Sequence, residues 1–167
     1  VKMEFDRMVE AKDYQALKAC GEKMKEILND LDKLNAFHPY CSLDKWIEDA
    51  RKMGDSPQLK DYYEKNARNL ITTWGGSLND YASRSWAGLI SDYYSKRWEV
   101  YINTFINAVG EGVTVDQKQL ENKLKEIEES WVNATERKNT RKDVHLTTGG
   151  LLSFSAFLFS KYQRLVK

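Results

Sequence analysis

Proline, cysteine and histidine are scarce in this 167-residue sequence, which holds two of each. The cysteines, Cys20 and Cys41, match neither a disulfide framework nor a zinc-binding spacing, so we expect two half-buried free thiols. The histidines, His38 and His145, have no cysteine or histidine at ligand spacing, and there is no H-E-x-x-H run. We therefore expect neither a metal site nor a cofactor.

An excess of charge of either sign is also absent. Lys plus Arg (26) and Asp plus Glu (25) sum to a net charge of +1, which gives no electrostatic argument for binding nucleic acid. The longest mainly apolar stretch, residues 149–159, is about half of the ~20 residues that a membrane span needs. We therefore expect a soluble chain with neither nucleic acid nor membrane among its partners.

The sequence begins at Val1, and residues 1–6 contain no apolar signal core followed by a small-residue cleavage site. Such a start is typical of a piece cut from a longer polypeptide. Length and composition fit one globular domain, or at most two small ones, with a buried core. We take residues 1–167 as a single helical domain.

The spacing of apolar residues predicts helices in the first half of the chain. Recurrence at three and four predicts a helix of about 20 residues over 17–34 and a shorter one over 43–53, which Gly54 ends in a left-handed conformation. Ser56 and Pro57 are typical of an N-cap and a first helical position. The helix that they open carries Leu59, Tyr62, Tyr63, Asn66, Leu70 and Ile71.

Glycines and capping boxes divide the next part of the chain. Residues 74–76 (Trp-Gly-Gly) end the preceding helix, and residues 77–80 (Ser-Leu-Asn-Asp) form a capping box, which predicts a new helix beginning at Leu78. We expect this helix to bend near Ser95 and to stop at the glycines of residues 110–112. More than a hundred residues after Pro57 contain no further proline, which also favours helices.

A second capping box at residues 114–117 opens a surface-lying amphipathic helix. The apolar stripe of this helix consists of Leu120, Leu124, Ile127 and Trp131. After it, residues 139–143 are expected to form a loop and residues 147–150 an interruption. Residues 151–165 fit a helix, although alternating serine and phenylalanine also suggest a strand. The chain is therefore predicted to be an all-α bundle of five to seven helices packed around aromatic side chains.

Catalytic motifs are not evident. There is no glycine-rich phosphate loop after a strand, no G-x-S-x-G, and no cysteine with a plausible histidine partner. Carboxylates gather with lysines on one predicted helix, which is typical of a solvated charged face rather than of acid–base catalysis. These are Glu121, Glu126, Glu128 and Glu129.

Residues 66–98 contain the densest group of aromatic and polar side chains, with Trp74 next to a glycine turn. Aromatic rings at a loop, flanked by amide and carboxyl groups, suit a sugar, because its C–H faces stack on rings while its hydroxyl groups form hydrogen bonds. The alternative is that the aromatic residues belong to the core. The spacing favours a core position for Trp86, Tyr93 and Trp98 and leaves Trp74 open between core and surface.

A series of short motifs runs through the same region. They are Trp-Ile-Glu-Asp-Ala-Arg (46–51), Tyr-Tyr-Glu (62–64), Asn-Ala-Arg (66–68), Thr-Trp-Gly (73–75), Asp-Tyr-Ala (80–82), Ala-Gly-Leu (87–89), Tyr-Tyr (93–94) and Arg-Trp (97–98). In these motifs and their order the chain resembles the C-terminal helical domain of the α-N-acetylglucosaminidases, glycoside hydrolase family 89. The resemblance extends from about residue 27 to residue 110.

The resemblance implies a parent enzyme that removes terminal α-linked N-acetylglucosamine with retention of configuration. Retaining hydrolysis uses two carboxyl groups, which the family carries on a (β/α)8 barrel, so that no catalytic residue is expected in this chain. The resemblance also implies a domain that packs on the barrel and lines one side of the sugar pocket, in a parent that is exported or lysosomal. The chain alone is expected to be inactive.

The same comparison assigns roles to individual residues. It implies that Trp74 and Tyr81 lie near the sugar and that Leu78 falls in the turn that approaches the pocket. It implies structural ion-pair or capping roles for Arg68 and Arg97.

Two functions of different classes remain open. The first is an accessory domain of an exo-acting glycosidase. The second is a freestanding helical protein-interaction module with no carbohydrate role, in which the aromatic residues are internal. The two differ in whether Trp74 and Tyr81 lie on one exposed patch.

Overall fold

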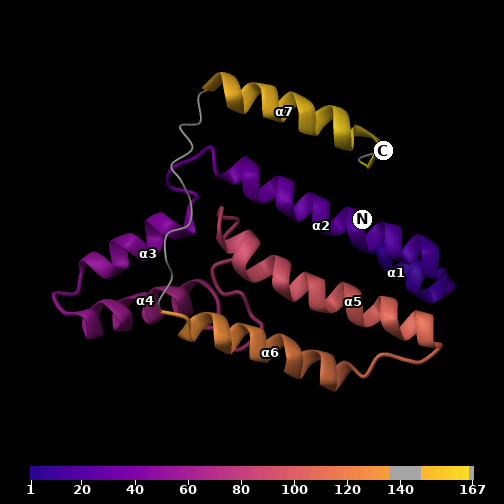
Figure 1. Ribbon diagram of the computed structural model, residues 1–167, viewed down its shortest axis with the longest axis horizontal. Helices are drawn as coiled ribbons and strands as arrows, with labels where there is room; N and C mark the ends of the chain where they lie inside the picture. The colour runs from indigo at the N-terminus through magenta and orange to yellow at the C-terminus, as the bar shows by residue number, and fades with distance from the viewer. Residues whose placement is uncertain (136–147, 166–167) are drawn as a thin grey trace.

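The computed structural model describes residues 1–135 and 148–165 (Figure 1). Within these ranges the chain forms seven α-helices and no strand, which confirms the expected all-α bundle of five to seven helices. The loop expected at residues 139–143 lies outside the described residues. The helices are α1 (Lys2–Ala11), α2 (Tyr14–Asn35), α3 (Leu43–Lys52), α4 (Pro57–Ile71), the π-helix η1 (Ile90–Tyr94), α5 (Ser95–Glu111), α6 (Gln117–Asn133), α7 (Thr148–Tyr162) and the short 3-10 helix η2 (Gln163–Leu165).

Helices α2 and α5 lie side by side in the middle of the bundle (Figure 1). Helix α7 lies along α2, α6 lies along α5, and α1 packs on both α2 and α5. Helices α3 and α4 form a helical hairpin at the end of the bundle where η1 leads into α5. The segment of residues 72–88, which joins α4 to η1, therefore belongs to this end.

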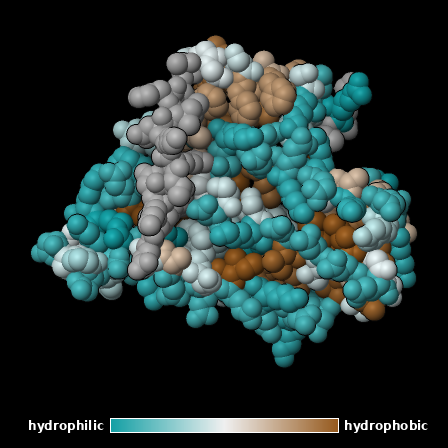
Figure 2. Space-filling view, viewed as in Figure 1, coloured by the Kyte–Doolittle hydropathy of each residue, from teal (hydrophilic) through white to brown (hydrophobic). Residues whose placement is uncertain are grey.

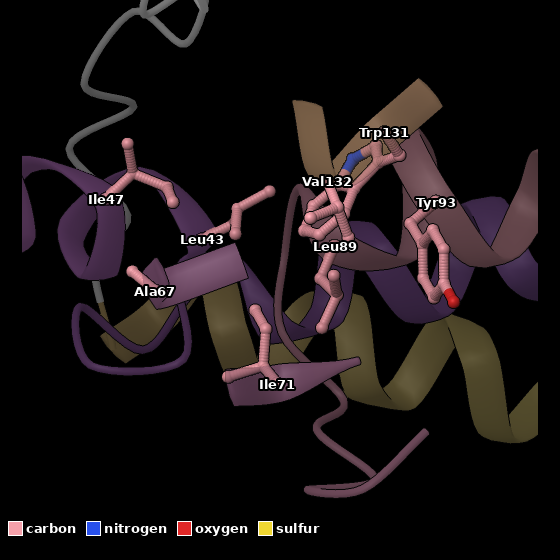
Figure 3. Packing of buried hydrophobic residues seen from close by; sticks show 8 residues of the cluster. All are labelled: Leu43, Ile47, Ala67, Ile71, Leu89, Tyr93, Trp131 and Val132. Carbon is pink, nitrogen blue, oxygen red and sulfur yellow. The ribbon is translucent and has the colours of Figure 1, made fainter. Parts of the chain in front are cut away.

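Two clusters of buried side chains form the core. One lies around η1 and consists of Leu43, Ile47, Ala67, Ile71, Leu89, Tyr93, Trp131 and Val132 (Figure 3). The other joins α1, α2 and α5 through Phe5, Leu17, Met24, Ile102 and Ile106. Tyr93 is fully buried, and the half-buried Trp86 and Trp98 pack against the first and second cluster, respectively, so all three contribute to the core as predicted. Cys20 and Cys41 are half-buried free thiols, as expected.

Local sequence signals predict several helix ends correctly. Helix α2 covers the residues predicted from the spacing. Helix α4 begins with Pro57 after Ser56, whose Oγ accepts a hydrogen bond from the Leu59 amide at 3.3 Å. Gly112 follows the last turn of α5 with a φ of 70°. Residues 151–165 are helical, in α7 and η2.

Three predicted boundaries are wrong. Gly54 is not left-handed; a Cβ at this position would lie 2.6 Å from the backbone nitrogen of Lys60, so glycine allows the close approach of α4. Asp116, not Thr114, is the N-cap of α6, because its carboxylate accepts a backbone N–H at 3.0 Å. Residues 148–150 form the first turn of α7 instead of an interruption, because packing along α2 stabilises this helix.

The buried face of α4 also differs from the expected one. Of the residues that the spacing assigned to this helix, Ile71 is buried, whereas Leu59, Tyr62 and Leu70 are exposed. The buried side chains of α4 are Glu64, Ala67, Arg68 and Ile71. Two of the four are charged, which a search for apolar spacing does not detect.

Helix α7 is apolar on two sides. Its inner side faces α2, where Phe154 stacks on Phe37 with ring centroids 5.8 Å apart and Lys161 pairs with Asp30 at 2.5 Å. On the outer side its side chains form part of an exposed hydrophobic area (Figure 2). The exposed large apolar residues of α7 are Leu152, Phe157 and Phe159. None of the described helices combines the length and the apolarity that a membrane crossing requires.

Candidate functional site

The structure brings Trp74 and Tyr81 into contact on the surface. Their ring centroids are 4.5 Å apart in an edge-to-face arrangement, with an angle of 64° between the rings. Trp74 is 57% exposed and Tyr81 is 53% exposed. Trp74 is therefore a surface residue and not part of the core.

These two residues belong to a closed turn of residues 72–81, which we call the aromatic turn. The Tyr81 amide donates to the Thr72 carbonyl at 3.0 Å and closes the turn at its base. Within the turn, Asn79 Nδ2 donates to the Gly75 carbonyl at 2.9 Å. A Cβ at Gly75 would lie 2.5 Å from Asn79 Nδ2 and 3.0 Å from Tyr81 Cδ2, so any other residue there would displace the Asn79 side chain.

The helix predicted to begin at Leu78 does not form. Leu78, Asp80 and Ser83 have φ values of 60°, 47° and 44°, which a right-handed helix excludes. The Ser77 hydroxyl donates to Glu128 Oε2 at 2.6 Å instead of capping a helix, and the Leu78 amide donates to the same carboxylate at 3.0 Å. This long-range acceptor replaces the local capping box, and regular helix resumes only at η1.

Glu128 is therefore not the solvated helix residue that we predicted. It is 2% exposed, and its Oε1 accepts a hydrogen bond from the Tyr93 hydroxyl at 2.9 Å, in addition to the donors from the aromatic turn. A signal for its burial exists in the sequence, because position 128 falls four residues after Leu124 and three before Trp131, on the apolar stripe of α6.

A second contact holds the aromatic turn next to Tyr81. Arg97 Nη1 of α5 lies 2.5 Å from Asp80 Oδ1 and also donates to the Tyr93 hydroxyl oxygen at 3.0 Å. Burial raises the pKa of Tyr93 far above its ordinary value, so the hydroxyl stays protonated and donates to Glu128. The ion-pair role expected for Arg97 is confirmed.

Arg68 also forms the expected ion pair. Its guanidinium donates to Glu64 Oε1 from Nε at 2.9 Å and from Nη2 at 2.6 Å, and both side chains are buried. The other oxygen of Glu64 accepts from Arg51 Nη1 at 2.6 Å. Arg68 also lies over the Trp131 ring, which belongs to the core cluster around η1. This pair fixes α4 to the core, and α4 leads directly into the aromatic turn.

The segment that leaves the aromatic turn is held by α2 and by the residues that precede α3. Asp32 Oδ1 accepts from the Gly88 amide at 2.7 Å and from the Ser91 amide at 3.2 Å. The Ala87 amide donates to the Cys41 carbonyl at 2.8 Å. Both ends of the segment 72–88 are thus fixed to the bundle.

The carboxylates near the aromatic pair are already engaged in hydrogen bonds. The carboxylates of Glu128 and Asp80 are engaged by donors that hold the turn, as described above, which makes them structural groups. Residues 1–135 and 148–165 contain no cluster of three His, Cys, Asp or Glu side chains that could hold a metal ion. A shallow groove of about 450 Å³ lies elsewhere, in the hydrophobic band between α5 and α6 (Figure 2), and no residue of the aromatic turn lines it.

The hydroxyl of Tyr94, beside Tyr93, makes the stability of the chain sensitive to alkaline pH. Burial raises the pKa of Tyr94 to about 12, and the Asp80 carboxylate adds to this effect. An unfolded tyrosine ionises near pH 10, so between about pH 10 and 12 the unfolded chain binds fewer protons than the folded chain. The free energy of unfolding is therefore expected to fall as the pH rises through this range.

Urea denaturation at a series of pH values tests this expectation, with Tyr94→Phe as the comparison. The substitution removes a hydroxyl that has no hydrogen-bond partner among the residues that the structure describes, so stability at pH 7 should be unchanged. The variant should lose less stability than the parent chain above pH 10. Equal losses in the two proteins would contradict the assignment to Tyr94.

The fold is an all-α bundle that carries an exposed aromatic pair on its surface. The family model described as the Alpha-N-acetylglucosaminidase (NAGLU) C-terminal domain matches residues 1–161, and the chain belongs to this family. The match confirms the resemblance seen in the motifs and extends it toward both ends of the chain.

Known relatives agree with this assignment. Human alpha-N-acetylglucosaminidase is 32% identical over 123 residues, which cover 72% of this chain and 17% of the human protein. A family 89 glycoside hydrolase of Clostridium perfringens, solved with its substrate GlcNAc-alpha-1,4-galactose, is 28% identical, with a TM-score of 0.77 over 95% of this chain and 18% of that chain. The complex of a Clostridium perfringens family 89 enzyme with 2-acetamido-1,2-dideoxynojirmycin gives 26% identity and a TM-score of 0.79, over 96% and 19%. The chain thus spans less than one fifth of each relative.

Proposed function

We propose that this chain is the C-terminal accessory domain of an exo-acting retaining α-N-acetylglucosaminidase. It packs on a catalytic (β/α)8 barrel of the same polypeptide, and its aromatic turn lines one side of the pocket for a terminal α-linked N-acetylglucosamine. Trp74 and Tyr81 face the sugar, and Leu78 contributes to the same wall. The chain itself supplies no catalytic residue.

The observation that carries this proposal is the exposed contact between Trp74 and Tyr81. A pair of large aromatic rings exposed on a surface is available to a ligand or a partner, and an aromatic face suits the C–H face of a sugar. Family membership supports the choice of sugar, since the bacterial relatives were solved with GlcNAc-alpha-1,4-galactose and with an acetamido sugar analogue. The length of these relatives supports a catalytic part outside this chain.

The alternative of a freestanding interaction module with internal aromatic residues is not favoured. It requires Trp74 and Tyr81 to lie inside the bundle, whereas more than half of each side chain is exposed. The exposed apolar side chains of α7 are available for contact with another domain, which an accessory domain also requires.

Kinetics of the full-length enzyme test the proposal. Trp74→Ala is expected to lower kcat/KM for an aryl α-N-acetylglucosaminide by roughly 10- to 100-fold, because it removes a face on which the sugar stacks. The chain alone should show no hydrolysis. Tyr62→Ala is the matched control, since Tyr62 is 58% exposed but lies on α4 outside the turn, and it should leave kcat/KM unchanged.

Two results would refute the proposal. One is hydrolysis by the chain alone at a rate comparable to that of a full-length enzyme. The other is an equal effect of Trp74→Ala and Tyr62→Ala on kcat/KM.

A further inference from the structure

We infer that Glu128 is a positioning residue for the sugar-facing aromatic pair. Its buried carboxylate fixes the middle of the aromatic turn and thereby sets the arrangement of Trp74 and Tyr81. The inference deepens the proposed function and rests on it for its kinetic consequence. Its structural part concerns only residues of this chain.

The contacts of Glu128 join three parts of the fold. The carboxylate belongs to α6 and accepts from the Ser77 hydroxyl and the Leu78 amide of the aromatic turn, and from the Tyr93 hydroxyl of η1. Ser77 and Leu78 lie midway between Trp74 and Tyr81 in the sequence. A single side chain thus connects the tip of the turn to the core.

The other contacts that close the turn or tie it to the bundle lie at its base, while the bond from Asn79 Nδ2 to the Gly75 carbonyl stays within the turn. The Tyr81 amide is bound to the Thr72 carbonyl, and Asp80 is bound to Arg97. Leu78, at the tip, has a left-handed backbone, which residues with a Cβ adopt infrequently, and its amide is bound to Glu128. Loss of Glu128 would therefore release the tip while the base stays fixed, and the contact between the two rings would loosen.

The electrostatic setting of Glu128 also distinguishes it from a purely structural carboxylate. Buried Glu64 is neutralised by Arg68 and Arg51. Glu128 forms no direct ion pair with a Lys or Arg among the described residues, and its hydrogen-bond partners are two hydroxyl groups and an amide. The Arg97 guanidinium, which donates to the Tyr93 hydroxyl oxygen, acts on it only through space. The contribution of Glu128 to the turn is geometric, because one carboxylate accepts several donors at once.

The structural part is tested on the ¹⁵N-labelled chain. In Glu128→Ala, the Leu78 amide should exchange its proton about tenfold faster than in the parent chain, and the indole N–H signal of Trp74 should shift, because the charge-assisted acceptor is gone. Amides of α2 and α5 should keep their exchange rates. Glu128→Gln retains one acceptor oxygen and should recover most of the protection. Glu129→Ala is the matched control, since its exposed side chain is adjacent in sequence.

The kinetic part is tested in the full-length enzyme. Glu128→Ala should raise KM about tenfold and leave kcat within about twofold, because the substitution loosens a binding wall and leaves the reacting groups in place. Glu128→Gln should restore KM to within about threefold of the parent value. A residue that acts on folding alone would lower the unfolding midpoint without this separation of KM and kcat.

The results of these experiments separate a failure of the inference about Glu128 from a failure of the proposed function. An unchanged Leu78 exchange rate and Trp74 signal in folded Glu128→Ala would overturn the inference. An increase in KM for Trp74→Ala without one for Glu128→Ala would also overturn it, with the proposed function intact. A turn that loosens while neither variant changes KM would refute the proposed function instead. If Glu128→Ala does not fold, Ser77→Ala removes one donor instead. In this variant the Leu78 exchange rate and KM must each rise about threefold over the parent values.

Discussion

Replacing Glu64 with alanine is expected to lower the free energy of unfolding by about 3–5 kcal/mol, because it removes the carboxylate that pairs with a buried arginine. Arg68 is 2% exposed and Glu64 is fully buried. Two nitrogens of Arg68 donate to one Glu64 oxygen, and Arg51 donates to the other. Removal of the carboxylate would therefore leave the positive charge of Arg68, between α4 and α6, without the negative charge of Glu64.

Urea denaturation followed by circular dichroism measures this loss. Asp61→Ala is the control, because Asp61 also pairs with Arg51 but its side chain is 44% exposed, and such a pair contributes about 1 kcal/mol or less. The double variant Glu64→Leu with Arg68→Met should lose less stability than Glu64→Ala, since it leaves no unpaired charge. A loss below about 1 kcal/mol in Glu64→Ala would contradict a buried pair.

This pair also explains why apolar spacing failed to locate the buried face of α4. The method follows apolar residues only, so it selected Leu59 and Leu70, which lie in α4 but are exposed, and did not consider Glu64 and Arg68. When two opposite charges meet at i and i+4 on a buried face, their mutual hydrogen bonds permit burial. The start of α4 was predicted correctly, because the cap formed by Ser56 and the first helical position at Pro57 are local signals.

The candidate site could be predicted in part. The motifs selected Trp74 and Tyr81 through a family resemblance, and the structure places the two rings in contact on the surface. The conformation that joins them could not be predicted, because the acceptor for Ser77 lies 51 residues away in the sequence. A capping box is a local signal, and in this case the long-range acceptor Glu128 replaces it.

Helix α1 was not predicted, for a different reason. It has ten residues, and isolated helices of this length are marginal in water. The predicted apolar spacing begins only at Leu17, so no continuous pattern pointed to a helix before it. Helix α1 is stabilised by tertiary packing, with Phe5 as its one fully buried side chain.

Phe5→Ala is therefore expected to lower the free energy of unfolding by about 3–5 kcal/mol, as the loss of a fully buried phenylalanine does. The Phe5 ring lies 6.1 Å from the Tyr101 ring and 6.2 Å from the Phe105 ring of α5, measured between centroids. A Cβ at Gly21 of α2 would lie 3.7 Å from the Phe5 ring, so α1, α2 and α5 meet around this side chain.

Urea denaturation and amide exchange together test this role of Phe5. In Phe5→Ala, the amides of α1 should exchange fastest, followed by those of α2 and α5 that face the cavity. Helix α1 detaches first because Phe5 is its single buried residue, whereas α2 has five and α5 has three. Met3→Ala on the same helix is the control; Met3 is 81% exposed, and its loss should change stability by less than about 0.5 kcal/mol. Equal stabilities of the two variants would show that α1 does not depend on Phe5 for its attachment to the bundle.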